Sequence, residues 1–155
     1  VAARAPHLEL TVFDLPAVAG QARTALAARG LGSRVRVVAG DVRRDPLPAG
    51  ADLVTLVRVL HDHDDDDVAT ILAAARRALV PGGTLLVAEP LADAPGLARV
   101  AEAYFGFYLW ALGQGRTRGV AEYTERLRRA GFEAVRAVPT RRPLITGLLV
   151  ARAPR

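Results

Sequence analysis

Short apolar runs alternate along the first half of the chain with stretches whose apolar residues recur at helical spacing. The runs predict strands over residues 8–13, 35–39, 53–60 and 84–88. The helical spacing predicts helices over 16–29 and 68–79. The third run is almost continuously apolar, which is typical of a parallel strand covered on both faces. This order predicts an open α/β sheet.

Proline and glycine mark the ends of these elements. Pro16 suits the first turn of the first helix, and Gly30 and Gly32 follow its last turn. The tripeptide Pro81-Gly82-Gly83 is expected to end the second helix before the strand that begins at residue 84.

The second half of the chain begins with an aromatic segment. Residues 97–112 are strongly apolar and predict a helix, and five of the eight aromatic residues of the chain lie within 104–110. A glycine-rich turn follows at 113–115. The remaining elements expected are a helix over 120–130 and an antiparallel strand pair at the sheet edge over 132–138 and 144–151.

Composition narrows the class of protein. The 155 residues suit one domain, and 51% hydrophobic with 24% charged residues is the balance of a folded, water-soluble chain. The lack of cysteine excludes disulfides, thiolate metal sites and cysteine nucleophiles. Because no apolar run approaches membrane-spanning length and the first residues lack a signal-peptide core, we expect a cytoplasmic protein.

The formal net charge is +5, and every one of the 21 basic residues is an arginine, since the chain has no lysine. Four arginine doublets without interleaved aromatic residues are typical of solvated faces, so no nucleic-acid partner is expected and DNA binding is a minor alternative. The doublets are Arg43/Arg44, Arg76/Arg77, Arg128/Arg129 and Arg141/Arg142. The chain has no methionine and begins with valine, so we expect it to be part of a longer protein.

Polar residues follow the carboxyl ends of four predicted strands: Asp14, Asp41, His61 and Glu89. In an open α/β sheet, ligands bind at this edge. Each residue also has a structural alternative. Asp14 could cap the helix, Asp41 could be a turn residue, and His61 could be a polar strand end.

Five aspartates lie close to His61, at position 62 and over 64–67. Hard cations bind several carboxylates, but consecutive helical residues point in different directions and do not converge on one ion. Compensation of the helix dipole is the better explanation, and no metal is expected. His63 is expected to lie in solvent.

Five short motifs occur in a fixed order and together resemble the S-adenosylmethionine (SAM)-dependent O-methyltransferases of the plant caffeate and bacterial secondary-metabolite type. They are Phe13-Asp14-Leu15-Pro16, Gly40-Asp41-Val42, Leu60-His61-Asp62, Pro81-Gly82-Gly83 and Val87-Ala88-Glu89. The aromatic segment 104–110, the turn 113–116 and the tail 139–147 are similar to those of demethylspheroidene O-methyltransferases. The resemblance covers the whole chain and implies a Rossmann-like class I methyltransferase sheet with an antiparallel last strand.

The resemblance implies that SAM is the cofactor. Asp14 matches the carboxylate that accepts hydrogen bonds from the ribose hydroxyls, and Leu15 matches a residue along the same nucleoside. Asp41 and Val42 match the pair beside the adenine, one accepting from its amino group and one packing on its face.

His61 matches the general base of this family, and Glu89 matches the acid that orients it. Methyl transfer requires the acceptor oxygen to lose a proton as it attacks, and histidine, whose ordinary pKa is about 6.5, can take that proton near neutral pH. An orienting carboxylate sets the tautomer and ring plane of such a base.

The substrate side of the resemblance implies an apolar acceptor, a carotenoid of the demethylspheroidene type. Four aromatic residues are candidates for one wall of its pocket: Tyr104, Phe107, Tyr108 and Trp110. Taken alone, the aromatic helix would equally suit a core or a dimer face. A carotenoid acceptor would bring peripheral contact with a photosynthetic membrane, and the family implies a homodimer. A phenolic or polyketide acceptor, or a non-catalytic remnant, are the alternatives.

Several positions depart from the family pattern. Thr117 stands where many relatives have a second acid, and Val57 stands where they have a lysine; Arg58 is expected to point to the other strand face. The first strand and glycine-rich loop of the family are not found, so we expect exposed or directly paired strand edges and a damaged cofactor site. The chain is then a partial catalytic domain. Its expected segments are a cofactor-binding half (1–93), an aromatic substrate side (94–118), and a closing helix with a strand pair (119–155).

Overall fold

A computed structural model describes residues 1–93, 98–140 and 146–155, with the side chains of 98–102 left out. The expected helix start at Leu97, the expected strand start at Leu144 and the doublet Arg141/Arg142 lie outside the described residues. The chain divides into two compact units, Val1–Leu47 and Pro48–Arg155.

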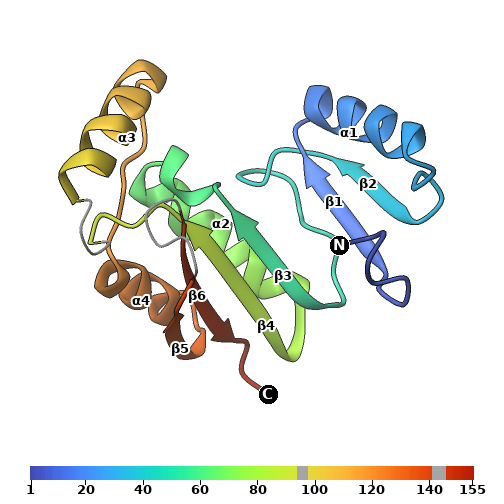
Figure 1. Cartoon of the computed structure of the whole chain (residues 1–155). Coiled ribbons are helices and arrows are strands. Elements are labelled where there is room, and N and C mark those ends of the chain that lie inside the picture. Colours follow the sequence, from blue (N-terminus) through green and yellow to red (C-terminus); the bar gives the residue numbers. More distant parts are fainter. Residues whose placement is uncertain (94–97, 141–145) are drawn as a thin grey trace. The chain divides into compact units, whose positions relative to one another are not determined.

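The first unit is a strand–helix–strand element (Figure 1). Strand β1 (Leu10–Asp14) pairs in parallel with β2 (Val35–Ala39), and α1 (Pro16–Ala28) connects them. Pro16 occupies the first turn of α1 as predicted, because its missing N–H would have no partner there. The pairing places the ends of both strands, and the residues that follow, at one edge of this small sheet.

The second unit is built on a four-stranded mixed sheet in the order β3-β4-β6-β5 (Figure 1). Strand β3 (Ala51–Val57) runs parallel to β4 (Leu79–Glu89). Strand β6 (Gly147–Arg152) is antiparallel to both β4 and β5 (Glu133–Val138). The α/β class and the antiparallel last strand are therefore confirmed.

The described residues of this unit also form the helices α2 (Asp65–Ala78), α3 (Ala98–Leu112) and α4 (Val120–Arg129). Helices α2 and α4 pack on the sheet, whereas α3 extends away from it (Figure 1). The core contains fully buried apolar side chains of α2, α4 and the central strands, among them Ile71, Leu72, Leu85, Leu127 and Leu149. No helix in the described ranges is long and apolar enough to cross a membrane.

The end of β3 differs from the prediction. The strand ends at Val57, and Arg58 adopts a left-handed backbone conformation with φ +55° instead of continuing the strand to residue 60. The Arg58 N–H donates to the carbonyl of Ala88, and the chain then turns through a 3₁₀ turn at Leu60–Asp62. His61 therefore lies in the turn formed by residues 59–64, which we call the His61 turn.

The start of β4 also differs from the prediction. Helix α2 ends at Ala78, and β4 begins at Leu79, so the glycines at 82 and 83 lie inside the strand. Partners distant in the sequence explain the difference. The Gly82 N–H donates to the carbonyl of Pro154, and the Ala153 N–H donates to the carbonyl of Gly83.

Strand β3 is an edge strand of its sheet. The expectation that β1 and β3 have exposed edges or pair directly stays a prediction, because the two strands belong to different units. Within the described residues of the second unit, β3 pairs with β4 on one side, and its Leu53 and Val57 are 51% and 56% exposed. An edge of this kind can pair with further chain.

Candidate active site

Glu89 is the last residue of β4 and is completely buried. Its Oε1 accepts hydrogen bonds from the backbone N–H groups of Val59 and Leu60, both at 2.8 Å. Its Oε2 lies 2.7 Å from Nδ1 of His61. Because donors approach both oxygens, the buried carboxylate has partners that compensate for its removal from water.

These partners assign the tautomer of His61. An ionised carboxylate only accepts hydrogen bonds. Nδ1 of His61 therefore carries the proton, and this N–H donates a hydrogen bond to Glu89. The other nitrogen, Nε2, lies 3.2 Å from Oδ1 of Asp62 without hydrogen-bond geometry. His61 is 1% exposed, and its Nε2 retains a lone pair that can accept a proton.

Two aromatic rings of α3 flank the imidazole of His61. The Phe105 ring meets it edge-on at 6.0 Å between centroids, and the Tyr108 ring lies at 6.1 Å. The guanidinium of Arg58 lies over the Phe105 ring at 5.4 Å, so Arg58 points toward α3. Burial, followed by the charge of Asp62, raises the pKa of the Tyr108 phenol.

The four aromatic residues predicted to line a substrate pocket have different environments. Tyr104, Phe107 and Trp110 are 69%, 75% and 81% exposed, whereas Tyr108 is 43% exposed and lies beside His61. Sequence reasoning missed Phe105, which is buried with Leu109. Their spacing of four residues places them on one helix face, and this signal could have identified the inward side of α3.

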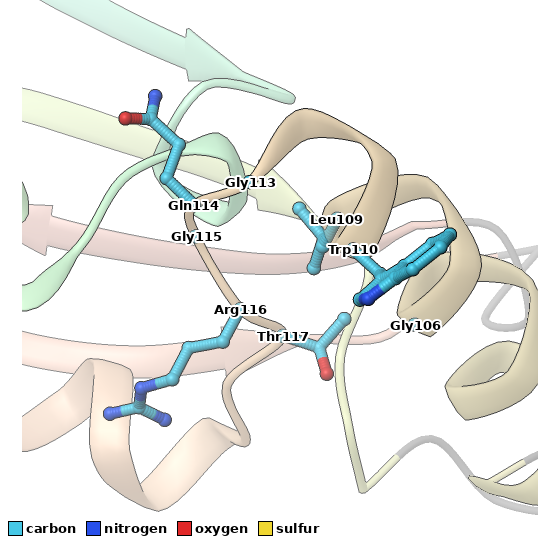
Figure 2. A pocket seen from close by; sticks show the side chains of 8 residues that line it. All are labelled: Gly106, Leu109, Trp110, Gly113, Gln114, Gly115, Arg116 and Thr117. Atoms are coloured by element: carbon cyan, nitrogen blue, oxygen red, sulfur yellow. The ribbon is translucent and has the colours of Figure 1, made fainter.

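A cavity of about 410 Å³ lies where α3 meets the turn that follows it. In Figure 2, Leu109, Trp110 and Thr117 border the hollow, while Gln114 and Arg116 extend away from Trp110. The lining residues are Gly106, Leu109, Trp110, Gly113, Gln114, Gly115, Arg116 and Thr117. Trp110 therefore lines the same cavity as Thr117, the residue that stands where many relatives have a second acid.

The turn at 113–118 contacts the His61 turn closely. The side-chain amide of Gln114 donates to the carbonyl of Asp62, and the N–H of Gly115 donates to the carboxylate of Asp64. Gly115 has φ +83°, and a Cβ there would meet the carbonyl oxygen of His61. Glycine is therefore required at 115 by both conformation and space.

Arg118 is a second residue that sequence reasoning missed. It is completely buried and binds Asp65 of α2, with its Nη2 2.7 Å from Oδ1. Arg116 and Arg126 also pair with Asp65, and hydrogen bonds led by that from Arg118 hold the pKa of Asp65 well below its ordinary value. The isolated arginine between Thr117 and Gly119 gives no sequence signal of burial.

The aspartate run has a more specific role than the expected dipole compensation, because Asp65 is the centre of an arginine cluster. The described residues include no group of three or more His, Asp or Glu side chains arranged to hold a metal ion. The prediction that His63 lies in solvent is wrong. Its side chain is only 18% exposed, with Nδ1 3.7 Å from Asp67, and its carbonyl accepts a 2.8 Å hydrogen bond from Arg118.

In the first unit, Asp14 is the last residue of β1 and is half-buried. Its Oδ1 accepts the N–H of Leu15 at 2.8 Å. Leu15 is the N-cap of α1 and the helix has no side-chain cap, so the alternative that Asp14 caps the helix is wrong. A carboxylate offers about four acceptor positions, so Asp14 retains capacity for the two hydroxyls of a ribose. The Leu15 side chain, 49% exposed, can contact a nucleoside.

Asp41 follows β2 and forms the turn that its structural alternative predicted. Its Oδ1 accepts from the backbone N–H of Arg43 at 3.0 Å, and its Oδ2 lies 2.8 Å from Nη2 of the same residue. Two hydrogen bonds from Arg43 lower the pKa of Asp41 from 3.8 to about 2. The bond from its side chain has the larger effect, and the bond from its backbone N–H has the smaller. Oδ2 still has room for an amino donor, and Val42 is half-buried, so this pair is compatible with an adenine.

The structure thus brings together the predicted residues within each unit. His61, Glu89 and Tyr108 meet in the second unit. In the first unit, Asp14 ends β1 and Asp41 lies just beyond the end of β2, its parallel neighbour. The convergence of all four strand-end residues on a single edge stays a prediction.

Comparison with known proteins gives consistent matches. Residues 1–133 match the O-methyltransferase domain family. The chain is 41% identical over 149 residues to demethylspheroidene O-methyltransferase of Cereibacter sphaeroides, covering 96% of this chain and 39% of that protein. It is 40% identical over 144 residues to 3-hydroxy-5-methyl-1-naphthoate 3-O-methyltransferase of Streptomyces sahachiroi, covering 93% of this chain and 42% of that protein. The chain thus spans less than half the length of either relative.

The fold gives the same match. The crystal structure of human N-acetylserotonin methyltransferase in complex with SAM superposes with a TM-score of 0.84 at 28% identity, covering 99% of this chain and 43% of that one. With the family match extending over residues 1–133, the comparison in sequence and the comparison in structure agree: the chain belongs to the O-methyltransferase family.

Proposed function

We propose that the protein carrying this chain transfers a methyl group from SAM to a hydroxyl of a small apolar acceptor, with His61 as general base. The observation that carries the proposal is the buried 2.7 Å contact between Nδ1 of His61 and Glu89, with Nε2 left without a hydrogen bond. Family membership supports the same reaction.

SAM, when bound, supplies a methyl carbon on a positively charged sulfur. The work of the protein is then to hold the acceptor oxygen in line and to remove its proton. Nε2 of His61 takes this proton, and Glu89 stabilises the resulting imidazolium through the hydrogen bond at Nδ1. An alcohol is a weak acid, so we expect proton transfer to accompany the attack of the oxygen.

The residues that would hold SAM lie in the first unit. Asp14 would accept from the ribose hydroxyls, and Leu15 would lie along the nucleoside. Asp41 and Val42 would flank the adenine. Asp14 fits because only its Oδ1 is used by the Leu15 N–H, and a fixed carboxylate at a strand end is suited to a vicinal diol.

For the acceptor, we propose a carotenoid of the demethylspheroidene type. Two relatives with that name are 41% identical to the chain, and the exposed aromatic residues of α3 suit a long apolar molecule. A phenolic acceptor is the second candidate, because a 40% identical relative is a naphthoate O-methyltransferase. Product analysis with hydroxylated carotenoids and with phenols distinguishes the two.

A carotenoid acceptor leads to two further proposals. The protein would act in the cytoplasm at the surface of a membrane, because carotenoids partition into lipid. The resemblance also implies a homodimer. Vesicle co-sedimentation tests the first proposal and analytical ultracentrifugation tests the second.

Replacement of His61 tests the mechanism. We expect His61→Ala to abolish turnover while the affinity for SAM stays within about twofold, because the base contributes to the chemical step and not to ground-state binding. His7→Ala is the matched control, since His7 is exposed in the other unit. Unchanged turnover of His61→Ala would remove His61 from the mechanism. Absence of SAM binding and methyl transfer in the unaltered protein would favour the non-catalytic alternative.

A further inference from the structure

On the carbonyl side of the His61 turn, the Arg118 side chain binds two carbonyls, and the Gln114 amide binds that of Asp62 between them. Nη1 of Arg118 donates to the carbonyl of Leu60 at 2.9 Å, and its Nη2 donates to the carbonyl of His63 at 2.8 Å. These two carbonyls lie on either side of His61 in the sequence. The guanidinium is completely buried, so water does not compete for these hydrogen bonds.

Glu89 holds the amide side of the same turn. Its Oε1 accepts the N–H groups of Val59 and Leu60, while its Oε2 binds the imidazole. The negatively charged Glu89 therefore binds backbone N–H groups of the turn, and the positively charged Arg118 binds backbone carbonyls of the same turn. Because the imidazole is attached to this backbone, movement of the turn would change the distance from Nδ1 to Glu89.

The geometry requires arginine at position 118. Two different nitrogens reach the two carbonyls, while Nε and Nη2 both reach Oδ1 of Asp65, at 3.2 and 2.7 Å. A planar guanidinium presents donors in fixed directions, whereas an ammonium group is a single point with rotating donors. Lysine could keep the charge pair with Asp65 but could not hold both carbonyls in this arrangement.

We propose that Arg118 is a positioning residue for His61, holding the carbonyls that flank the base so that its imidazole stays aligned between Glu89 and the acceptor hydroxyl. The inference rests on the proposed role of His61 as general base. It assigns Arg118 a role in alignment of the base, beyond that of one more ion pair in the Asp65 cluster.

Arg118→Lys is the principal variant, because it keeps the positive charge beside Asp65 and so limits the effect on folding. We expect its kcat to fall about 10²-fold, since displacement of a reacting group by about 1 Å has an effect of this size. KM for SAM should stay within about twofold, because that site is in the first unit. Arg118→Ala, once circular dichroism shows that it is folded, should have a larger fall in kcat than Arg118→Lys.

The matched control is Arg126→Ala. Like Arg118, Arg126 pairs with Asp65, at 2.7 Å, and it also pairs with Glu122, at 2.9 Å. In the described part of the chain, the side-chain hydrogen bonds and ion pairs of Arg126 go to these two carboxylates. We expect its kcat to stay within about twofold of the unaltered protein, because partly exposed ion pairs contribute little. Equal losses in Arg118→Lys and Arg126→Ala would overturn the proposal in favour of a general effect of the ion-pair cluster.

A second readout does not depend on turnover. In protein with ¹⁵N-labelled histidine, the Nδ1 proton of His61 should give a slowly exchanging signal that is lost in His61→Ala. We expect exchange of this proton to be at least about tenfold faster in Arg118→Lys and unchanged in Arg126→Ala. An unaltered signal together with an unaltered kcat in Arg118→Lys would overturn the proposal. Retained turnover in His61→Ala would instead refute the proposed function, and the exchange measurement distinguishes that result.

Discussion

The two units hold their candidate site residues in contrasting ways. In the first unit, Asp14 is bound by the next residue in the chain and Asp41 by a residue two positions away. In the second, His61 is bound by a residue 28 positions away, and the carbonyls of Leu60 and His63 by one 58 and 55 positions away. One unit relies on local contacts and the other on the completed fold.

This difference indicates where substitutions should matter. The Asp41–Arg43 pair has side chains that are 20% and 34% exposed, so solvent screens it. Glu89 and Arg118 are fully buried, where loss of one partner leaves an uncompensated polar group. We therefore expect large effects in the second unit and small ones in the first.

The largest effect in the comparison is expected for Glu89→Gln. The glutamine oxygen can still accept from Val59 and Leu60, but its amide group would donate to Nδ1 of His61 and place the proton on Nε2. A base with the wrong tautomer cannot take the acceptor proton, so kcat should fall about 10²–10⁴-fold. Steady-state kinetics measure this loss.

Glu125→Gln is the control for that substitution. Glu125 pairs with Arg129 on α4, and the two side chains are 61% and 79% exposed. Its removal should leave kcat unchanged and alter stability by less than about 0.5 kcal/mol. A Glu89→Gln protein with unaltered kcat would show that buried, long-range contacts do not control the base.

An intermediate effect is expected for Gly115→Ala. An added Cβ would meet the His61 carbonyl oxygen and lie 2.7 Å from the carbonyl carbon of Asp62, so the two turns would have to separate. Gly113→Ala is a close control, because Gly113 has a similar φ of +76° with nothing within 4 Å of its Cβ position. Both variants carry the cost of positive φ, of about 1 kcal/mol.

The steric contact should lower the free energy of unfolding of Gly115→Ala by a further 1–3 kcal/mol, roughly the cost of overpacking. Urea denaturation of both variants measures the difference. Equal stabilities would mean that the turn at 113–118 does not constrain the His61 turn, and the contrast between the units would weaken.

The smallest effect is expected for Arg43→Ala in the first unit. The pKa of Asp41, lowered from 3.8 to about 2 chiefly by the side-chain hydrogen bond from Arg43, should return toward 3.8. A folded-state pKa below the unfolded value contributes stability that is present above pH 3.8 and is lost as the pH falls toward 2. Because solvent reaches the partly exposed pair, the contribution should stay below about 1 kcal/mol.

A carboxyl NMR titration of Asp41 in both proteins checks the pKa, and unfolding at pH 7 and near pH 2 checks the stability. The difference between the two proteins should shrink at the lower pH. A loss above 1 kcal/mol at pH 7 would show that this local pair is not screened, contrary to the comparison.

Much of the framework was predictable from local patterns. Strand β2 has the predicted bounds, and α1 ends within one residue of its prediction. Apolar periodicity and the prolines and glycines that bound it act over a few residues, so they are visible in the sequence. The meeting of His61 with Glu89 was expected from the family resemblance; Glu89 ends β4, and His61 lies beyond the end of β3, its parallel neighbour.

Local patterns did not predict where β3 ends and where β4 begins. Arg58 leaves the strand at φ +55°, and the Pro81-Gly82-Gly83 segment lies within β4 instead of ending the helix before it. In both places the deciding hydrogen bonds come from distant residues, Ala88 for the first and Ala153 and Pro154 for the second. Tertiary pairing overrode the local turn signal there.

The sequence by itself determined the α/β order, the helix and strand periodicity, and the identity of the strand-end residues, because each depends on neighbours within one or two turns of chain. Only the tertiary structure decided the burial of Arg118, its contacts with the His61 turn, and the choice of Phe105 over Phe107 beside the imidazole. These depend on which segments, more than 40 residues apart, pack together. No local pattern carries that information, because burial and partner choice are properties of the packed chain.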